Sequence, residues 1–238
     1  MSKVIYIPEY KHNLIFFEKG GSSLMVGFFK SLLDWKGVNV TDRPTGNEWI
    51  GDRTLFVRNP LERLVSIFYH LNVVKGSGMT AADKIEKLNT FLDGYEEKCK
   101  TSNNSHLQPQ SWDYDAGKDD RIVKIEDIME GYNNLVSTYR ASSNISFSTT
   151  QPFFTAEEYI KNFGIVESVG IPMDDKDRMF AVTLYGFILN ELNNGHHHNE
   201  SHLMIGWLKM HNRRDVLNKL IRITKDEMER FGYTNQLI

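Results

Sequence analysis

The segment LFVRNPLERLVS, residues 55–66, carries the strongest structural signal in the chain. Its apolar start is typical of a buried strand. Asn59 can cap a helix, and Pro60 fits the first helical position, where no N–H is needed. Arg58 is therefore predicted at the end of a strand, beside the free N–H groups that begin a helix, an arrangement that suits a phosphate.

The helix predicted from residue 60 has a buried side and a separate flank. Its apolar residues recur with helical spacing, at Leu61, Leu64, Val65 and Phe68. Ser66 follows Arg63 on a different flank of the same helix. An alternative interpretation of Arg58 is a surface ion pair with Glu62.

A second segment, FFEKGGSSL at residues 16–24, repeats this arrangement. Residues 14–17 are predicted as a short buried strand, the two glycines permit a tight turn around an anion, and the serines start a helix. Lys19 precedes the glycines, so the Gly-Lys-Ser/Thr pattern of nucleoside triphosphate sites is missing. A glycine turn with an exposed lysine is the alternative. Two such turns in one domain suggest a ligand with two separated phosphate groups.

Together the two segments resemble the cofactor motifs of sulfotransferases that use 3′-phosphoadenosine 5′-phosphosulfate (PAPS). The resemblance implies that the first motif binds the 5′-phosphosulfate, through Lys19, Gly20, Gly21, Ser22 and Ser23. It implies that Arg58 and Ser66 bind the 3′-phosphate. The implied fold is α/β, a three-layer P-loop-like sulfotransferase fold with a mostly parallel central sheet flanked by helices. Glu18 departs from the first motif, because a proline is often found at its position.

Further matches follow in the family's order. Residues 105–110, SHLQPQ, resemble the His-x-x-Pro-Gln segment of the carbohydrate sulfotransferase branch. Residues 122–128 are similar to the strand and helix that follow it, and residues 224–233 to the terminal helix with its Phe-Gly-Tyr ending. The resemblance therefore extends from about residue 14 to residue 233.

Two residues are candidates for the chemistry of sulfuryl transfer. The Lys19 ammonium suits the charge that builds on the leaving phosphate, and no metal is needed. His106 is the candidate base, because imidazole accepts protons near neutral pH. Glu126 is the competing base, unless it or Asp127 caps the helix that begins there.

The histidine-rich stretch GHHHNESH, residues 195–202, raises the possibility of a metal site. Adjacent histidines cannot all face one ion, and their spacing fits no standard zinc pattern, so a polar loop is favoured. Elsewhere the sequence predicts a helix over 82–98, a polar loop over 101–120 and a strand over 121–125. Two further helices are expected, over 128–139 and 174–192.

Composition limits the partners and the compartment. The chain has 238 residues, 40% of them hydrophobic, which predicts a single domain over residues 1–238. A net charge of −3 gives no overall electrostatic reason to bind nucleic acid or an anionic membrane. The first apolar stretch is short for a signal or anchor, and Cys99 is the single cysteine. We expect a cytoplasmic protein of a bacterial cell or a virus-infected host.

The sequence thus predicts a PAPS-dependent sulfotransferase that modifies an acceptor hydroxyl, on a glycan. Two alternatives stay open, a P-loop nucleotide-dependent kinase and a non-catalytic glycan- or nucleotide-binding protein with the same fold. The missing Walker lysine argues against the kinase.

Overall fold

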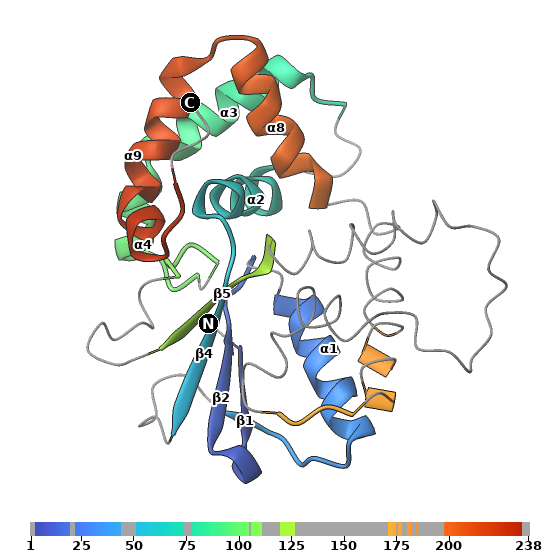
Figure 1. Ribbon diagram of the computed structural model, residues 1–238. Coiled ribbons are helices and arrows are strands. Elements are labelled where there is room, and N and C mark those ends of the chain that lie inside the picture. Colours follow the sequence, from blue (N-terminus) through green and yellow to red (C-terminus); the bar gives the residue numbers. More distant parts are fainter. Residues whose placement is uncertain are drawn as a thin grey trace, which may run out of the picture.

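The central sheet consists of strands β1 (Lys3–Ile7), β2 (His12–Phe16), β3 (Thr41–Arg43), β4 (Asp52–Val57) and β5 (Arg121–Lys124). They lie in the order β3-β1-β2-β4-β5, as Figure 1 shows in part. The computed structural model describes residues 3–19, 22–43, 51–73, 78–104, 106–110, 120–126, 171–174, 176–177, 180–181, 184 and 198–234. The predicted single domain remains a prediction.

The pairing of these strands is mixed. β2 and β4 are parallel, as are β4 and β5, whereas β1 runs antiparallel to both β2 and β3. The mostly parallel sheet of the sequence prediction is therefore not confirmed within the described strands. The antiparallel pair arises because the short 3₁₀ helix η1 (Pro8–Tyr10) and Lys11, with a left-handed φ of 47°, turn β1 directly into β2.

Because β2 and β4 are parallel, their carboxyl-terminal ends lie at the same edge of the sheet. Phe16, the last residue of β2, pairs with Phe56 near the end of β4. At the opposite end, Gly51 has a φ of +83°, and a Cβ there would overlap the backbone oxygen of Lys11. That oxygen accepts a 3.0 Å hydrogen bond from the N–H of Asp52, which begins β4.

Helices flank this sheet, as predicted for an α/β fold. α1 (Ser22–Trp35) packs on one face, where its aromatic residues meet Phe16 and Phe56 in the core. A second group comprises α2 (Pro60–Asn72), α3 (Ala81–Asp93), α4 (Tyr95–Thr101), α8 (His198–Met210) and α9 (Arg214–Arg230). Figure 1 shows α2, α3, α8 and α9 gathered beyond one end of the strands, apart from α1.

Both helix starts next to the strand ends agree with the sequence prediction. The Asn59 side chain accepts a 3.0 Å hydrogen bond from the N–H of Leu61, and Pro60 occupies the first turn of α2. The predicted apolar positions of α2 are buried: Leu61, Leu64, Val65 and Phe68. α1 begins at Ser22, directly after the glycine pair.

Two predicted segments are corrected. The helix expected over 82–98 is two helices, because α3 ends at the Gly94 cap and α4 starts again at Tyr95. Part of the polar loop expected over 195–202 is helical, since α8 begins at His198. α8 buries Met204, Ile205 and Leu208 in the core that it shares with α2, and this packing supports a helix in a sequence of middling helix propensity.

Other expectations are met in part. The strand predicted over 121–125 is β5, which ends at Lys124. Residues 102–104 and 106–110 form no helix or strand, in agreement with the predicted loop. The helix expected over 128–139 lies outside the described residues, and that over 174–192 is described only at residues 174, 176–177, 180–181 and 184.

Candidate functional site

Arg58 lies where β4 ends and α2 begins, at the edge of the sheet that also carries the end of β2. Its Nη1 donates to the backbone oxygen of Lys19 over 3.4 Å, and its Nη2 to Glu62 Oε2 over 3.2 Å. The residue is only 7% exposed. The ion pair with Glu62 that the alternative interpretation expected is therefore present, but Arg58 is buried and not on the surface, and the same guanidinium reaches the Lys19 turn.

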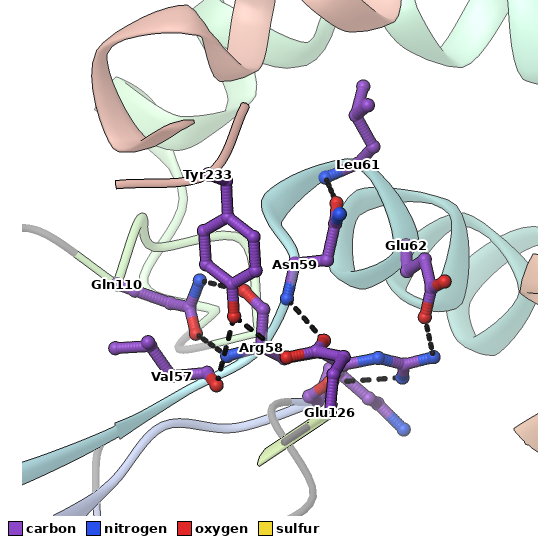
Figure 2. A network of polar contacts seen from close by, with 9 residues as sticks. Val57, Arg58, Asn59, Leu61, Glu62, Gln110, Glu126 and Tyr233 are labelled. Carbon is purple, nitrogen blue, oxygen red and sulfur yellow. Dashed lines mark hydrogen bonds and ion pairs between the residues drawn. The ribbon is translucent and has the colours of Figure 1, made fainter. Parts of the chain in front are cut away.

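The backbone of Arg58 is held by Gln110, as Figure 2 shows. The N–H of Arg58 donates to Gln110 Oε1 and its carbonyl accepts from Gln110 Nε2, both over 3.0 Å. Gln110 is fully buried. A single side-chain amide thus satisfies both polar groups of one backbone residue, at the point where the strand ladder has ended.

Glu126 supports the start of α2 from the other side. Its Oε1 accepts a 2.6 Å hydrogen bond from the N–H of Asn59, and its Oε2 accepts a 2.8 Å bond from the hydroxyl of Tyr233 (Figure 2). Burial raises the pKa of the Glu126 carboxyl, although these hydrogen bonds act in the opposite direction. The Glu126 side chain thus joins β5, the first turn of α2 and the chain after α9.

Lys19 occupies the turn after β2 in a left-handed conformation, with a φ of 59°. Such a φ is uncommon for a residue with a side chain and is found at functional turns. Burial lowers the pKa of the Lys19 ammonium, and the neighbouring Glu18 carboxylate counteracts this effect. The turn therefore carries a partly desolvated cation.

Arg63 is a buried residue of the site that sequence reasoning missed. Its side chain is 3% exposed and donates from Nε to the backbone oxygen of Glu18 (2.9 Å) and from Nη2 to that of Gln108 (2.7 Å). It thereby ties the Lys19 turn, α2 and the His106 segment together. The position of Arg63 beside the apolar stripe of α2 is a sequence signal for burial. Its two acceptor carbonyls could not be predicted, because they belong to segments that are distant in the sequence.

His106 lies close to the Lys19 turn. Its Nδ1 is 2.6 Å from Glu18 Oε2, and its ring centroid is 4.6 Å from that of His70 on α2. Burial lowers the pKa of His106; Glu18 raises it, and His70 and Lys19 lower it further. The imidazole is thus biased toward its neutral, proton-accepting form.

The structure brings together several of the predicted site residues. Lys19, Arg58 and His106 are linked through Glu18, Arg63 and Gln108. Ser66 lies partly buried on α2. Gly20 and Gly21 lie outside the described residues, as do the side chains of Ser22 and Ser23, although both serines belong to α1.

The described ranges hold neither a metal-type group of side chains nor a helix fit to span a membrane. No three His, Cys, Asp or Glu side chains there are grouped so as to hold a metal ion. No helix in the same ranges is both long enough and apolar enough to cross a membrane.

The arrangement defines an α/β protein with cationic turns at two adjacent strand ends, each followed by a helix. The sequence model of the sulfotransferase family matches residues 36–234, well over half of the chain, and the chain belongs to this family. The match contains Arg58, His106 and Glu126 and begins after Lys19. Searches of curated proteins and of solved structures gave no match. Sulfuryl transfer is thus the general chemistry of the family to which the site belongs.

Proposed function

We propose that this protein transfers a sulfuryl group from PAPS to an acceptor hydroxyl on a glycan. The observation that carries the proposal is the contact between Arg58 and the Lys19 turn, which places two cationic residues beside two helix starts. Helix N-termini and cations together favour bound phosphate. The glycan acceptor is supported by the resemblance of residues 105–110 to the carbohydrate branch.

The donor set suits a ligand with two anionic ends. Lys19, with the backbone that leads into α1, would hold the 5′-phosphosulfate. Arg58, together with Ser66 on α2, would hold the 3′-phosphate. A phosphate at Arg58 shares the guanidinium with Glu62, whose carboxylate lies 3.2 Å from Nη2. The planar guanidinium has five donors and can serve more than one acceptor.

His106 is assigned the role of base, in preference to Glu126. The Glu126 oxygens accept hydrogen bonds from Asn59 and Tyr233, which gives this carboxylate a supporting role at the start of α2. His106 would take the proton of the acceptor hydroxyl as the acceptor oxygen bonds to sulfur. Lys19 would stabilise the phosphate oxygen that receives the electron pair of the broken bond to sulfur.

Two measurements test the proposal. Isothermal titration calorimetry should show binding of 3′-phosphoadenosine 5′-phosphate (PAP) in the presence of a metal chelator, and no magnesium-dependent binding of ATP. Transfer of label from PAPS should appear in a panel of hydroxylated glycans. ATP–magnesium binding without PAP binding would indicate the kinase, and PAP binding without turnover on any acceptor would indicate a binding protein.

A further inference from the structure

The carboxylate of Glu18 occupies one edge of the His106 imidazole. Glu18 Oε2 lies 2.6 Å from Nδ1, with the two side chains 20% and 29% exposed. Nδ1 is buried, and within the described part of the chain it has no aligned hydrogen bond, so the contact is a close approach that becomes an ion pair when the imidazole is protonated. The rest of the His106 side chain accounts for its 29% exposure, so an acceptor can approach the ring away from Glu18.

The position of this pair is set by buried structure. Arg63 donates to the backbone oxygen of Glu18 itself and to that of Gln108, two residues after His106. A single guanidinium therefore fixes the distance between the two segments that carry the carboxylate and the imidazole. The backbone N–H of His106 donates a 3.0 Å hydrogen bond to Asn104 Oδ1, which also restrains the backbone of His106.

The charges that act on His106 include those of the Lys19 turn and of α2, and the N-terminal amine, which lowers its pKa. Glu18 is the neighbour that favours the imidazolium, whereas His70 and Lys19 disfavour it, and burial lowers the pKa of His106 as the largest effect. If Glu18 were neutral, burial, His70 and Lys19 would all lower the pKa of His106 without opposition. The carboxylate thus prevents the imidazole from becoming too weak a base.

We infer that Glu18 is a positioning residue for His106, which it pairs through the Nδ1 edge so that Nε2 takes the proton of the acceptor hydroxyl. The inference rests on the proposed function. In the transfer step, the acceptor O–H bond breaks as the proton goes to Nε2, and the acceptor oxygen forms its bond to sulfur. The bond from sulfur to the leaving phosphate oxygen breaks, and that oxygen keeps the electron pair. The resulting imidazolium lies beside the Glu18 carboxylate, which stabilises it.

This role also accounts for an anionic residue next to an anion-binding turn. A carboxylate beside a phosphosulfate is unfavourable unless it points away or is paired. Glu18 is paired with His106 instead of facing the bound anion.

The first arm of the test measures the His106 titration by NMR in the full-length protein without ligands. The imidazole signals are assigned by their loss in His106→Gln. In Glu18→Gln, the His106 midpoint should fall by about one pH unit, because the favourable charge is gone. Glu18→Asp should give an intermediate midpoint, and Glu97→Gln, which neutralises an exposed carboxylate on α4, should give the wild-type value. An unchanged midpoint in Glu18→Gln would overturn the inference.

The second arm measures turnover with PAPS and the acceptor found for the wild type. Glu18→Gln should lower kcat by about tenfold or more, move the acidic limb of kcat to lower pH, and leave PAP affinity undiminished. Glu18→Asp should recover part of the rate. A lower midpoint with unchanged kcat would refute the positioning role. A wild type that transfers no sulfuryl group would overturn the proposed function instead, while the NMR arm would still report whether the pair exists.

Discussion

Arg58 Nη1 lies 3.4 Å from the backbone oxygen of Lys19, although the two residues are 39 positions apart. The contact forms because β2 and β4 are parallel neighbours, so the turns that follow them meet at one sheet edge. Each turn leads into a helix, α1 or α2. An anionic ligand bound there would be in reach of both helix starts, which makes the two turns one candidate binding region.

Arg58 should matter more for a ligand with a 3′-phosphate than for one without it. We predict that Arg58→Ala weakens PAP binding by about 2 kcal/mol or more, the range for charge-assisted hydrogen bonds. Binding of adenosine 5′-phosphosulfate should change little. Calorimetry with both ligands checks the prediction, and equal losses for the two would refute the assignment of Arg58 to the 3′-phosphate.

The matched control for this variant is Arg222→Ala, which removes an exposed guanidinium from α9. It should bind PAP as the wild type does. Since Arg58 is buried and paired with Glu62, the thermal unfolding midpoint of Arg58→Ala must be recorded beside its affinity. Arg58→Lys retains the charge without the planar fork and should recover only part of the affinity.

Lys19 should act mainly on the chemical step. We predict that Lys19→Ala lowers the single-turnover rate far more than it weakens PAP binding, because its ammonium interacts most strongly with the charge that develops on the leaving phosphate. Lys11→Ala is a close control, since Lys11 also has a left-handed φ but is exposed in the hairpin turn. Near-normal single-turnover rates in Lys19→Ala would reduce Lys19 to a turn residue.

His106 and Glu126 can be separated by one pair of variants. His106→Ala should lose about two to four orders of magnitude in turnover, the usual contribution of a general base, with PAP affinity nearly unchanged. In the wild type, kcat/KM should rise with pH through a group that titrates below the ordinary histidine value of about 6.5, since the pKa of His106 is lowered by burial. That acidic limb should vanish in His106→Ala.

Glu126→Gln, in contrast, should retain most of the turnover. The amide oxygen can still accept from the Asn59 N–H, so the start of α2 keeps its support. Loss of activity in a folded Glu126→Gln, combined with a normal rate in His106→Ala, would reverse the assignment of the base.

His12 should make the fold sensitive to acid. His12 is the first residue of β2 and is 7% exposed. Its Nε2 lies 2.8 Å from Thr54 Oγ1 on β4. Burial lowers its pKa, an effect that Asp52 opposes and Arg121 reinforces. The unfolded chain therefore binds more protons at this residue below about pH 6.5, so stability falls as the pH falls below that value, by at most about 1.4 kcal/mol per pH unit for one proton.

Urea unfolding between about pH 5.5 and 7.5 measures this dependence. His12→Gln should show a shallower slope than the wild type. The control His211→Gln changes an exposed histidine after α8 and should keep the wild-type slope. A His12→Gln slope equal to that of the wild type would show that other groups govern the acid sensitivity.

Local signals were sufficient to predict where α1 and α2 begin. Asn59 and Pro60 mark the start of α2, and the apolar spacing of this helix shows which of its sides is buried. Gly94 is a local stop signal that the sequence prediction did not use, whereas the helix from His198 depends on packing between helices. The antiparallel pairing in the sheet was not predicted either, because the sequence motifs on which the fold prediction rests all lie after β1.

The partners of the site residues were beyond sequence reasoning for a related reason. Arg63 is charged and was expected on a helix flank, yet it is buried because two backbone carbonyls from other segments accept its donors. The pairing of Glu18 with His106 likewise joins residues that only the tertiary fold brings together. The sequence can thus identify such residues as candidates, but their partners are determined by the order of the strands in the sheet.

The close contact at Gly51 sets the register between β2 and β4, the two strands that lead to the candidate site. Because Gly51 packs against Lys11, β2 and β4 start level, and five residue pairs, from His12–Asp52 to Phe16–Phe56, then bring them to the same edge. One residue added within either strand would displace its terminal turn by about 3.3 Å and invert the facing of the side chains beyond the insertion. The register that sets the spacing between the two cationic turns is thus established at the opposite end of the strands, where η1 (Pro8–Tyr10) joins β1 to β2.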